Sequence, residues 1–95
     1  MLTTAEKVAF WLGQPVTIEI DDPYEESIKW FAECRPYSGN MIEVTWTSAL
    51  TKANGQTFSY PSVTKEWFSK EELLSIHPGG TWWTKPLLEL FPEDD

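Results

Sequence analysis

Several kinds of residue are scarce in this chain of 95 residues, and each scarcity excludes a class of protein. A single cysteine cannot form an internal disulfide, which excludes the disulfide-stapled secreted miniproteins and fits a reducing compartment. One histidine and one cysteine far apart do not make a structural zinc site, whose ligands usually come in closely spaced pairs. No apolar run approaches the ~18 residues of a membrane span, and the N-terminal residues lack the basic start and apolar stretch of a signal peptide. We therefore expect a cytoplasmic protein without a metal cofactor.

Basic residues are also few, with 7 Lys and Arg against 15 Asp and Glu and a formal net charge of −8. The bases occur singly along the chain, and no two are adjacent. Nucleic-acid-binding proteins usually carry a basic patch, because neutralisation of phosphates dominates their affinity. Anionic membrane surfaces attract clustered bases for the same reason. We therefore expect the chain to bind neither nucleic acid directly nor a membrane.

Apolar and aromatic residues are abundant, at 41% and 15% of the chain, which is too rich for a disordered protein. A chain of this length buries about two thirds of its surface on folding, which suffices for one small core. We expect a single domain over residues 1–91, followed by an acidic, frayed tail at 92–95.

The N-terminal pattern predicts a helix. Thr3 followed three residues later by Glu6 fits a capping box, and Gly13 is a natural C-terminal stop. The predicted buried face of this helix, from its spacing of three and four, consists of Val8, Trp11 and Leu12. Alternation of apolar and polar residues then predicts a strand over 16–20.

The segment from Pro23 to Arg35 fits two structures. Pro23 at a first helical position and the acids after it favour a helix, whereas apolar residues at every second position from Ile28 favour a strand. A turn cluster at 36–40 and a second alternating run at 42–47 suggest a hairpin. We expect a short helical turn at 23–26 followed by a strand, with a full helix as the alternative.

Asn54-Gly55 predicts a second hairpin, with a type I′ turn in which both central residues have positive φ. This turn would join the run at 42–47 to a strand at 57–60, and Pro61 would end that strand or mark it as an edge.

The C-terminal third predicts a short helix near 69–77, because Ser69 and Glu72 fit a second capping box. Its expected apolar stripe is Leu73, Leu74 and Ile76. The apolar segment 82–91 should dock on the domain as extended chain with a short helical turn. The expected fold class is α+β: a three- to four-stranded antiparallel meander with an N-terminal helix, the helix near 69–77 and the docked C-terminal segment, the helices lying on one face.

Cys34 and His77 are the only candidates for a nucleophile and its base. Cys34 falls on the apolar face of its strand, where a free cysteine is ordinarily a small core residue. His77 falls at a helix C-terminus before Pro78, where an imidazole can cap terminal carbonyls. We expect no enzymatic activity and no cofactor.

Acidic residues gather in the window 19–26, which contains no base. The spacing of Asp21, Asp22, Glu25 and Glu26 departs from a calcium-binding EF-hand loop. The window either keeps the chain soluble or attracts a basic partner, because complementary charge raises association rates and fixes orientation.

Six tryptophans exceed what a small core easily encloses, because each buries on the order of 150–250 Å² and its indole N–H needs a partner. Four fall on predicted apolar faces and are expected in the core: Trp11, Trp30, Trp46 and Trp67. Trp82 and Trp83 are adjacent, so in extended chain they point in opposite directions and one should face solvent. Exposed tryptophan is enriched at interface hot spots.

The leading hypothesis is a small acidic protein-binding module, an inhibitor or accessory factor that occupies a basic site on a larger protein. Its composition is typical of the inhibitors that phages and mobile elements use against host defence, whose targets include nucleic-acid-handling sites. The predicted partner-binding residues are Asp21, Asp22, Glu25, Glu26, Trp82, Trp83 and, at a hairpin tip, Tyr37. The alternatives are an assembly subunit that forms a homo-oligomer, and a small-molecule or carbohydrate-binding domain that uses exposed tryptophan.

Overall fold

The fold is a four-stranded antiparallel sheet in the order β1-β2-β3-β4, with helices before and after it. The computed structural model describes residues 2–76 and 81–92, with the backbone alone at 61–64. The elements are α1 (Thr4–Trp11), β1 (Val16–Asp21), β2 (Ile28–Tyr37), β3 (Met41–Thr51), β4 (Thr57–Phe68), α2 (Lys70–Ile76) and α3 (Thr84–Leu88). The expected α+β class and the meander are confirmed. The predictions for His77 and for the tail after Pro92 lie outside the described residues.

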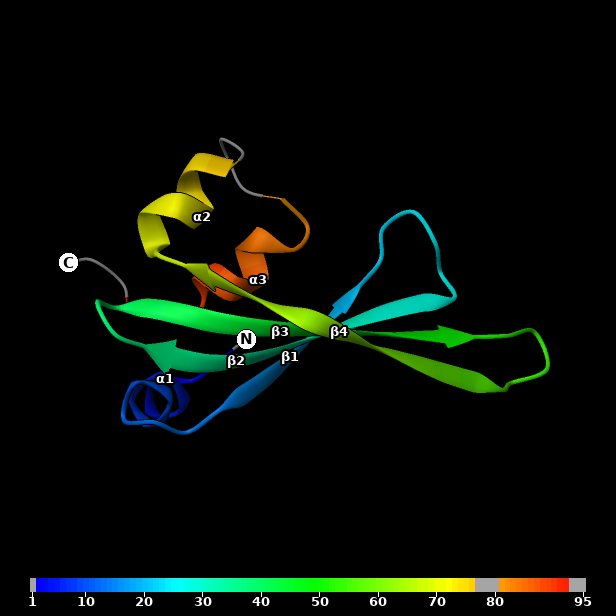
Figure 1. Cartoon of the computed structure of the whole chain (residues 1–95), viewed down its shortest axis with the longest axis horizontal. Helices are drawn as coiled ribbons and strands as arrows, with labels where there is room; N and C mark the ends of the chain where they lie inside the picture. The colour runs from blue at the N-terminus through cyan, green and yellow to red at the C-terminus, as the bar shows by residue number, and fades with distance from the viewer. Residues whose placement is uncertain (1, 77–80, 93–95) are drawn as a thin grey trace.

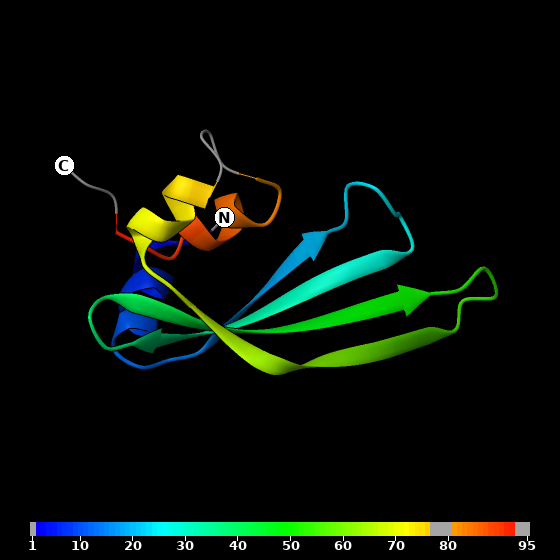
Figure 2. The same ribbon diagram turned by 45° about the horizontal axis from the view of Figure 1, so that its top comes forward.

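The molecule is elongated, measuring 47 × 29 × 26 Å. The helices gather at one end of the sheet, while the β1–β2 loop and the β3–β4 hairpin project at the other end (Figures 1 and 2). The sheet therefore extends beyond its helical cover.

Helix α1 begins as predicted and packs differently. Glu6 N donates to Thr3 Oγ1 at 3.1 Å and Thr3 N donates to Glu6 Oε1 at 3.0 Å, which completes the capping box. Of the predicted buried face, Trp11 is half-buried and packs against the core, whereas Val8 and Leu12 are wrong, being 55% and 83% exposed, and Phe10 is fully buried instead. Phe10 lies in the core with Leu90 and Phe91, so the contact of α1 with the C-terminal segment determines which face of the helix is buried.

The ambiguous segment is a strand, and the full helix is wrong. Ala32 of β2 lies opposite Ile18 of β1 on one side and Trp46 of β3 on the other. The expected helical turn at 23–26 is instead a non-helical loop. Asp22 Oδ1 accepts hydrogen bonds from Tyr24 N at 2.8 Å and from Glu25 N at 3.1 Å, so a side chain replaces the backbone acceptor of a helix.

The second hairpin is confirmed, and its predicted turn type is wrong. Gly55 has a φ of +86°, but Asn54 is not among the residues with positive φ, as a type I′ turn would require. Lys52 N donates to Gln56 O at 2.8 Å, which leaves a three-residue loop. The Asn54 side chain accepts from Gln56 N at 2.9 Å and so stabilises this longer loop.

Strand β4 continues past Pro61 to Phe68, so Pro61 does not end it. The pairing shifts there, because Thr47 lies opposite Pro61 whereas Thr45 lies opposite Lys65. β4 is an edge strand, where a residue without an N–H is tolerated.

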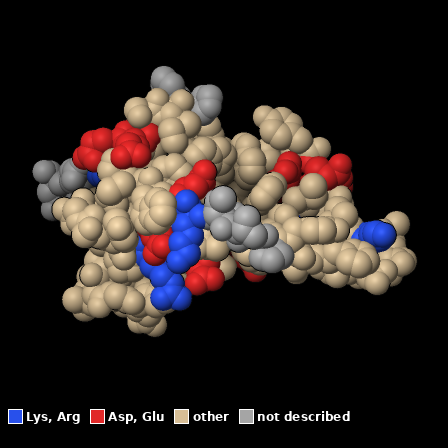
Figure 3. Space-filling model, viewed as in Figure 1, with Lys and Arg blue, Asp and Glu red and all other residues tan. Residues whose placement is uncertain are grey.

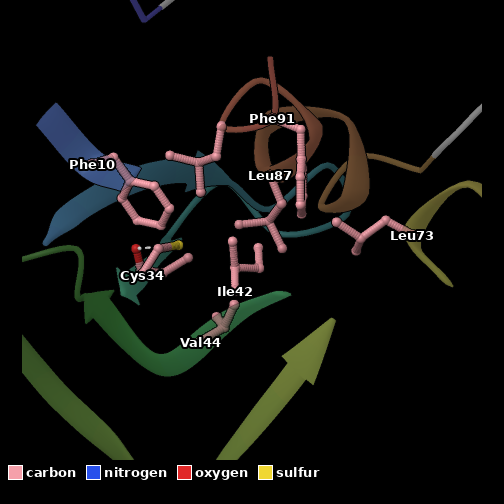
Figure 4. Packing of buried hydrophobic residues seen from close by; sticks show 9 residues of the cluster. Phe10, Cys34, Ile42, Val44, Leu73, Leu87 and Phe91 are labelled. Atoms are coloured by element: carbon pink, nitrogen blue, oxygen red, sulfur yellow. Dashed lines mark hydrogen bonds between the residues drawn. The ribbon is translucent and has the colours of Figure 1, made fainter. Parts of the chain in front are cut away.

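The core lies between one face of the sheet and the helices (Figure 4). It consists of Phe10, Ala32, Cys34, Ile42, Val44, Leu73, Leu87, Leu90 and Phe91. All three helices contribute to this one cluster, which confirms that they share a face and that the C-terminal segment docks. The segment docks as α3 and its flanking turns, so the expected extended conformation is wrong. The predicted stripe of α2 is confirmed for Leu73 alone, since Leu74 and Ile76 are 52% and 38% exposed.

Candidate functional site

A pocket of about 460 Å³ lies on the sheet face that carries the core. Its described lining residues are Trp30, Trp46, Tyr60, Glu66, Trp82 and Trp83, and we term it the aromatic pocket. Trp30 of β2 and Trp46 of β3 stand two positions along their strands from the core residues Ala32 and Val44. The pocket therefore forms where the core gives way to the projecting part of the sheet.

The four indole rings of the pocket form a connected cluster. The Trp30 and Trp46 ring centroids are 6.4 Å apart with planes at 89°, and Trp83 meets Trp46 at 6.0 Å and 83°. Trp82 lies 6.4 Å from Trp30 with its plane tilted by 44°. These edge-to-face and tilted arrangements are the ones that aromatic pairs prefer. The rings are consequently held in fixed relative orientations around the pocket.

A turn before α3 directs both adjacent tryptophans to the pocket. Thr84 N donates to Thr81 Oγ1 at 3.1 Å, and Thr81 N donates to Thr84 Oγ1 at 2.6 Å. In such a turn neighbouring side chains diverge by roughly 100° rather than the ~180° of extended chain. Trp82 and Trp83 are both half-buried, so the expectation that one of them faces solvent is wrong.

None of the four tryptophans expected in the core is fully buried. Trp11, Trp30 and Trp46 are half-buried, with Trp11 and Trp46 packed against the core, and Trp67 is 44% exposed. Trp67 lies opposite Glu43, on the sheet face that the core does not use. Phe68 lies opposite the core residue Ile42 and packs against the core, so the alternation of side chains along β4 turns Trp67, the residue before it, to the other face.

Carboxylates hold two of the pocket tryptophans in place. Trp30 Nε1 donates to Asp22 Oδ2 at 3.0 Å, and Trp46 Nε1 donates to Glu66 Oε2 at 2.9 Å. The hydrogen bond from Trp30, followed by that from the backbone N–H of Tyr24, lowers the pKa of Asp22 below its ordinary value of 3.8. Asp22 is therefore ionised at neutral pH and connects the β1–β2 loop to the aromatic pocket.

The acidic residues of the window 19–26 differ in their partners and in their exposure to solvent. Lys29 lies opposite Asp21 because β1 and β2 pair, and its Nζ is 3.6 Å from Glu19 and 3.9 Å from Asp21. The Asp22 carboxylate accepts hydrogen bonds from the loop backbone and from Trp30, whereas Glu25 and Glu26 are exposed. Figure 3 shows acidic side chains gathered over this loop and, separately, over α2.

The structure thus brings some predicted site residues together and leaves one apart. Asp22 reaches Trp82 through Trp30, which joins the acidic loop to the tryptophan pair. Tyr37 lies at the far end of β2 on the opposite sheet face, with its ring 6.0 Å from that of Trp67.

Four lining residues are absent from the sequence-based site: Trp30, Trp46, Tyr60 and Glu66. The alternating patterns around Trp30 and Trp46 predict that each lies on the apolar face of its strand. Only the pairing of β2 with β3 shows that the two rings meet. Glu66 carried no signal, because its approach to Trp46 depends on the register shift in β4.

Cys34 is fully buried, and burial raises the pKa of its thiol to about 12, with the charge of Glu33 adding to the rise. Few thiolates form at neutral pH under these conditions, which disfavours Cys34 as a nucleophile. Among residues 2–76 and 81–92, no three His, Cys, Asp or Glu side chains converge on a metal position. No helix in the same ranges is long and apolar enough to span a bilayer.

Comparison with protein-family models, with curated proteins and with solved structures finds no match to this chain.

Proposed function

We propose that this chain is a small acidic protein-binding module that binds a basic surface of a larger protein, as an inhibitor or accessory factor. Its binding surface is the aromatic pocket together with the neighbouring β1–β2 loop, residues 22–27, and Asp21, the last residue of β1 before that loop. The observation that carries this proposal is the pocket itself, four tryptophans of which two are held by carboxylates.

Tryptophan clusters are typical of interface hot spots, where a few large side chains carry most of the binding energy inside a polar rim. The indoles of the aromatic pocket are half-buried and already oriented by ring contacts and hydrogen bonds. A partner would lose little free energy in ordering them.

The charge of the surface supports a basic partner. The loop, which the hydrogen bond from Trp30 to Asp22 connects to the pocket, carries the exposed acids Glu25 and Glu26, and the chain has a net charge of −8. An acidic surface steers a basic protein toward it and orients the encounter. This combination suits an inhibitor that occupies a basic, nucleic-acid-handling site, as phage and mobile-element inhibitors of host defence do.

Affinity capture from the native host, with mass spectrometry of the retained proteins, tests the proposal. The test variant carries Asp21→Asn, Glu25→Gln and Glu26→Gln, and the control carries Glu71→Gln, Glu72→Gln and Glu89→Gln. Both lose three charges, but the control loses them from α2 and from the residue after α3. We expect the retained protein to fall about tenfold for the loop variant and to persist for the control.

The affinity for the captured protein should also fall as ionic strength rises from about 0.05 to about 0.5 M, because salt screens exposed charges. Equal retention by both variants, or an affinity unchanged by salt, would contradict the proposal.

Carbohydrate or small-molecule binding is a second candidate, favoured by the same lining of tryptophan rings, which can stack on a sugar. A panel of neutral glycans read by tryptophan fluorescence separates the two. The protein-binding proposal predicts no saturable response, whereas a response lost on Trp82→Ala would favour the second candidate.

A further inference from the structure

The chemistry of the aromatic pocket indicates the kind of side chain that it receives. Five of its six described lining residues are aromatic, and Glu66 is the charged one among them. The face of an indole ring is electrostatically negative and attracts a cation within about 6 Å, Trp being the strongest of the aromatic residues in this respect. Ring faces and carboxylate therefore favour the same sign of charge in the ligand.

The ring orientations favour a cationic group stacked on a single indole over a flat ring held between two parallel indoles. The measured interplanar angles are 89° for Trp30 with Trp46, 83° for Trp46 with Trp83, and 44° for Trp30 with Trp82. None of these pairs forms the parallel sandwich into which a nucleobase would slide. A group stacked on one ring instead meets the edge or the tilted face of another.

Glu66 is placed to complete the recognition of a cation. Its Oε2 accepts from Trp46 Nε1 at 2.9 Å, which fixes the carboxylate at the pocket. An ionised carboxylate has about four lone-pair sites, so acceptor capacity is left for a ligand. Tyr60, 55% exposed, lies on the same face and leaves the pocket open to solvent.

We propose that the aromatic pocket receives an arginine side chain of the protein partner, with the guanidinium stacked on an indole face and hydrogen-bonded to Glu66. Arginine fits better than lysine because its guanidinium is planar, weakly hydrated and able to give two parallel hydrogen bonds to one carboxylate. This assignment rests on the proposed function, since it specifies the chemistry of the basic partner at that same surface.

Peptide titration of the whole chain tests the assignment. Three probes differ in one side chain: N-acetyl-Gly-Arg-Gly-amide and its counterparts with lysine and with citrulline, the neutral isostere of arginine. Binding is followed by NMR through the indole Nε1–H signals, of which Trp11 and Trp67 lie outside the pocket. We expect saturable shifts of Trp30 and Trp46, with the arginine peptide bound about tenfold more tightly than the citrulline peptide and more tightly than the lysine peptide.

The matched variants are Glu66→Gln and Glu33→Gln. Glutamine keeps an acceptor for Trp46 Nε1 and removes the charge, while Glu33 is exposed on the opposite sheet face, where it pairs with Arg35. Glu66→Gln should weaken arginine binding about three- to tenfold, and Glu33→Gln should leave it unchanged. Equal effects of the two variants, citrulline or lysine binding as tightly as arginine, or shifts confined to Trp11 and Trp67 would each overturn the assignment.

The assignment and the proposed function fail separately. If the arginine peptide does not bind while salt-dependent capture of a partner persists, only the arginine assignment is overturned. If the arginine peptide binds in the pocket but the loop variant captures as well as the control, only the proposed function is overturned.

Discussion

Asp22 shows how one side chain can serve both a loop and a pocket. Its Oδ1 accepts from two backbone N–H groups of the β1–β2 loop, and its Oδ2 accepts from Trp30 Nε1. Both interactions favour the charged form, and both lower its pKa. The position of Trp30 in the pocket is therefore coupled to the ionisation of a loop residue.

This coupling predicts a pH dependence. Because the pKa of Asp22 is lowered in the folded chain, the stabilisation is present above the ordinary value of 3.8 and is lost as pH falls through the lowered value. The Trp30 indole Nε1–H signal should keep its neutral-pH position down to pH 3.8 and shift below it. Asp22→Asn should abolish that transition, and a midpoint at or above 3.8 in the unaltered chain would contradict the coupling.

The burial of Cys34 predicts how fast its thiol reacts. A rise of the pKa from 9.0 to about 12 lowers the thiolate fraction at neutral pH roughly a thousandfold, and the sulfur is fully buried. A thiol reagent should therefore modify the folded chain very slowly and the chain unfolded in urea rapidly. Rapid modification under native conditions would show that Cys34 is accessible and ionised.

Among the elements, the turn of Thr81 and Thr84 does the most to shape the site. Thr84 is buried, and its hydroxyl accepts from Thr81 N at 2.6 Å. Thr84→Val keeps the shape of the side chain and removes the hydroxyl that accepts this hydrogen bond. The substitution should lower the free energy of unfolding by about 1–3 kcal/mol. It should also change the near-UV circular dichroism of the tryptophans. Thr17→Val, at an exposed position of β1, is the control and should stay within about 0.5 kcal/mol. Similar losses for both variants would argue against the turn's role.

The β3–β4 hairpin offers a test of its three-residue loop. Gly55 has a φ of +86°, and a Cβ added there would meet no atom within 4 Å, so any cost of Gly55→Ala is backbone strain. We expect about 1–2 kcal/mol of lost stability by urea denaturation. Ala53→Ser, two residues before Gly55 and without positive φ, should change stability by less than about 0.5 kcal/mol. An unchanged stability for Gly55→Ala would be inconsistent with this loop.

Local sequence patterns predicted the elements well, because caps and alternation act over a few residues. The capping box of Thr3 and the strands of the meander are examples. The same patterns failed where distant contacts decide. Phe10 rather than Val8 is buried because α1 meets the C-terminal segment, where Trp11 Nε1 donates to Leu90 O at 2.7 Å.

The candidate site could be predicted only in fragments for the same reason. The sequence shows the surplus of tryptophan and the acidic window, and these two features predict Trp82 and Asp22 as site residues. Their meeting through Trp30 depends on the β2–β3 pairing and on the turn before α3. Glu66 reaches Trp46 across a shifted register that no short pattern encodes.

At the scale of the whole molecule, the fold separates two surfaces that carry exposed aromatic side chains. Tyr24 of the β1–β2 loop and Tyr60 of the aromatic pocket are 87% and 55% exposed. Tyr37 and Trp67 are 49% and 44% exposed and contact each other on the opposite sheet face. A partner that binds at the aromatic pocket and the β1–β2 loop would cover the first pair of residues and leave the second pair exposed.

Hydroxyl-radical footprinting of the chain alone and with its captured partner shows which of the two pairs the partner covers. Side-chain oxidation, read by mass spectrometry, reports the solvent exposure of all four residues in one sample. We expect the partner to protect Tyr24 and Tyr60 and to leave Tyr37 and Trp67 as reactive as before. Protection of Tyr37 and Trp67, with Tyr24 and Tyr60 unchanged, would contradict this expectation.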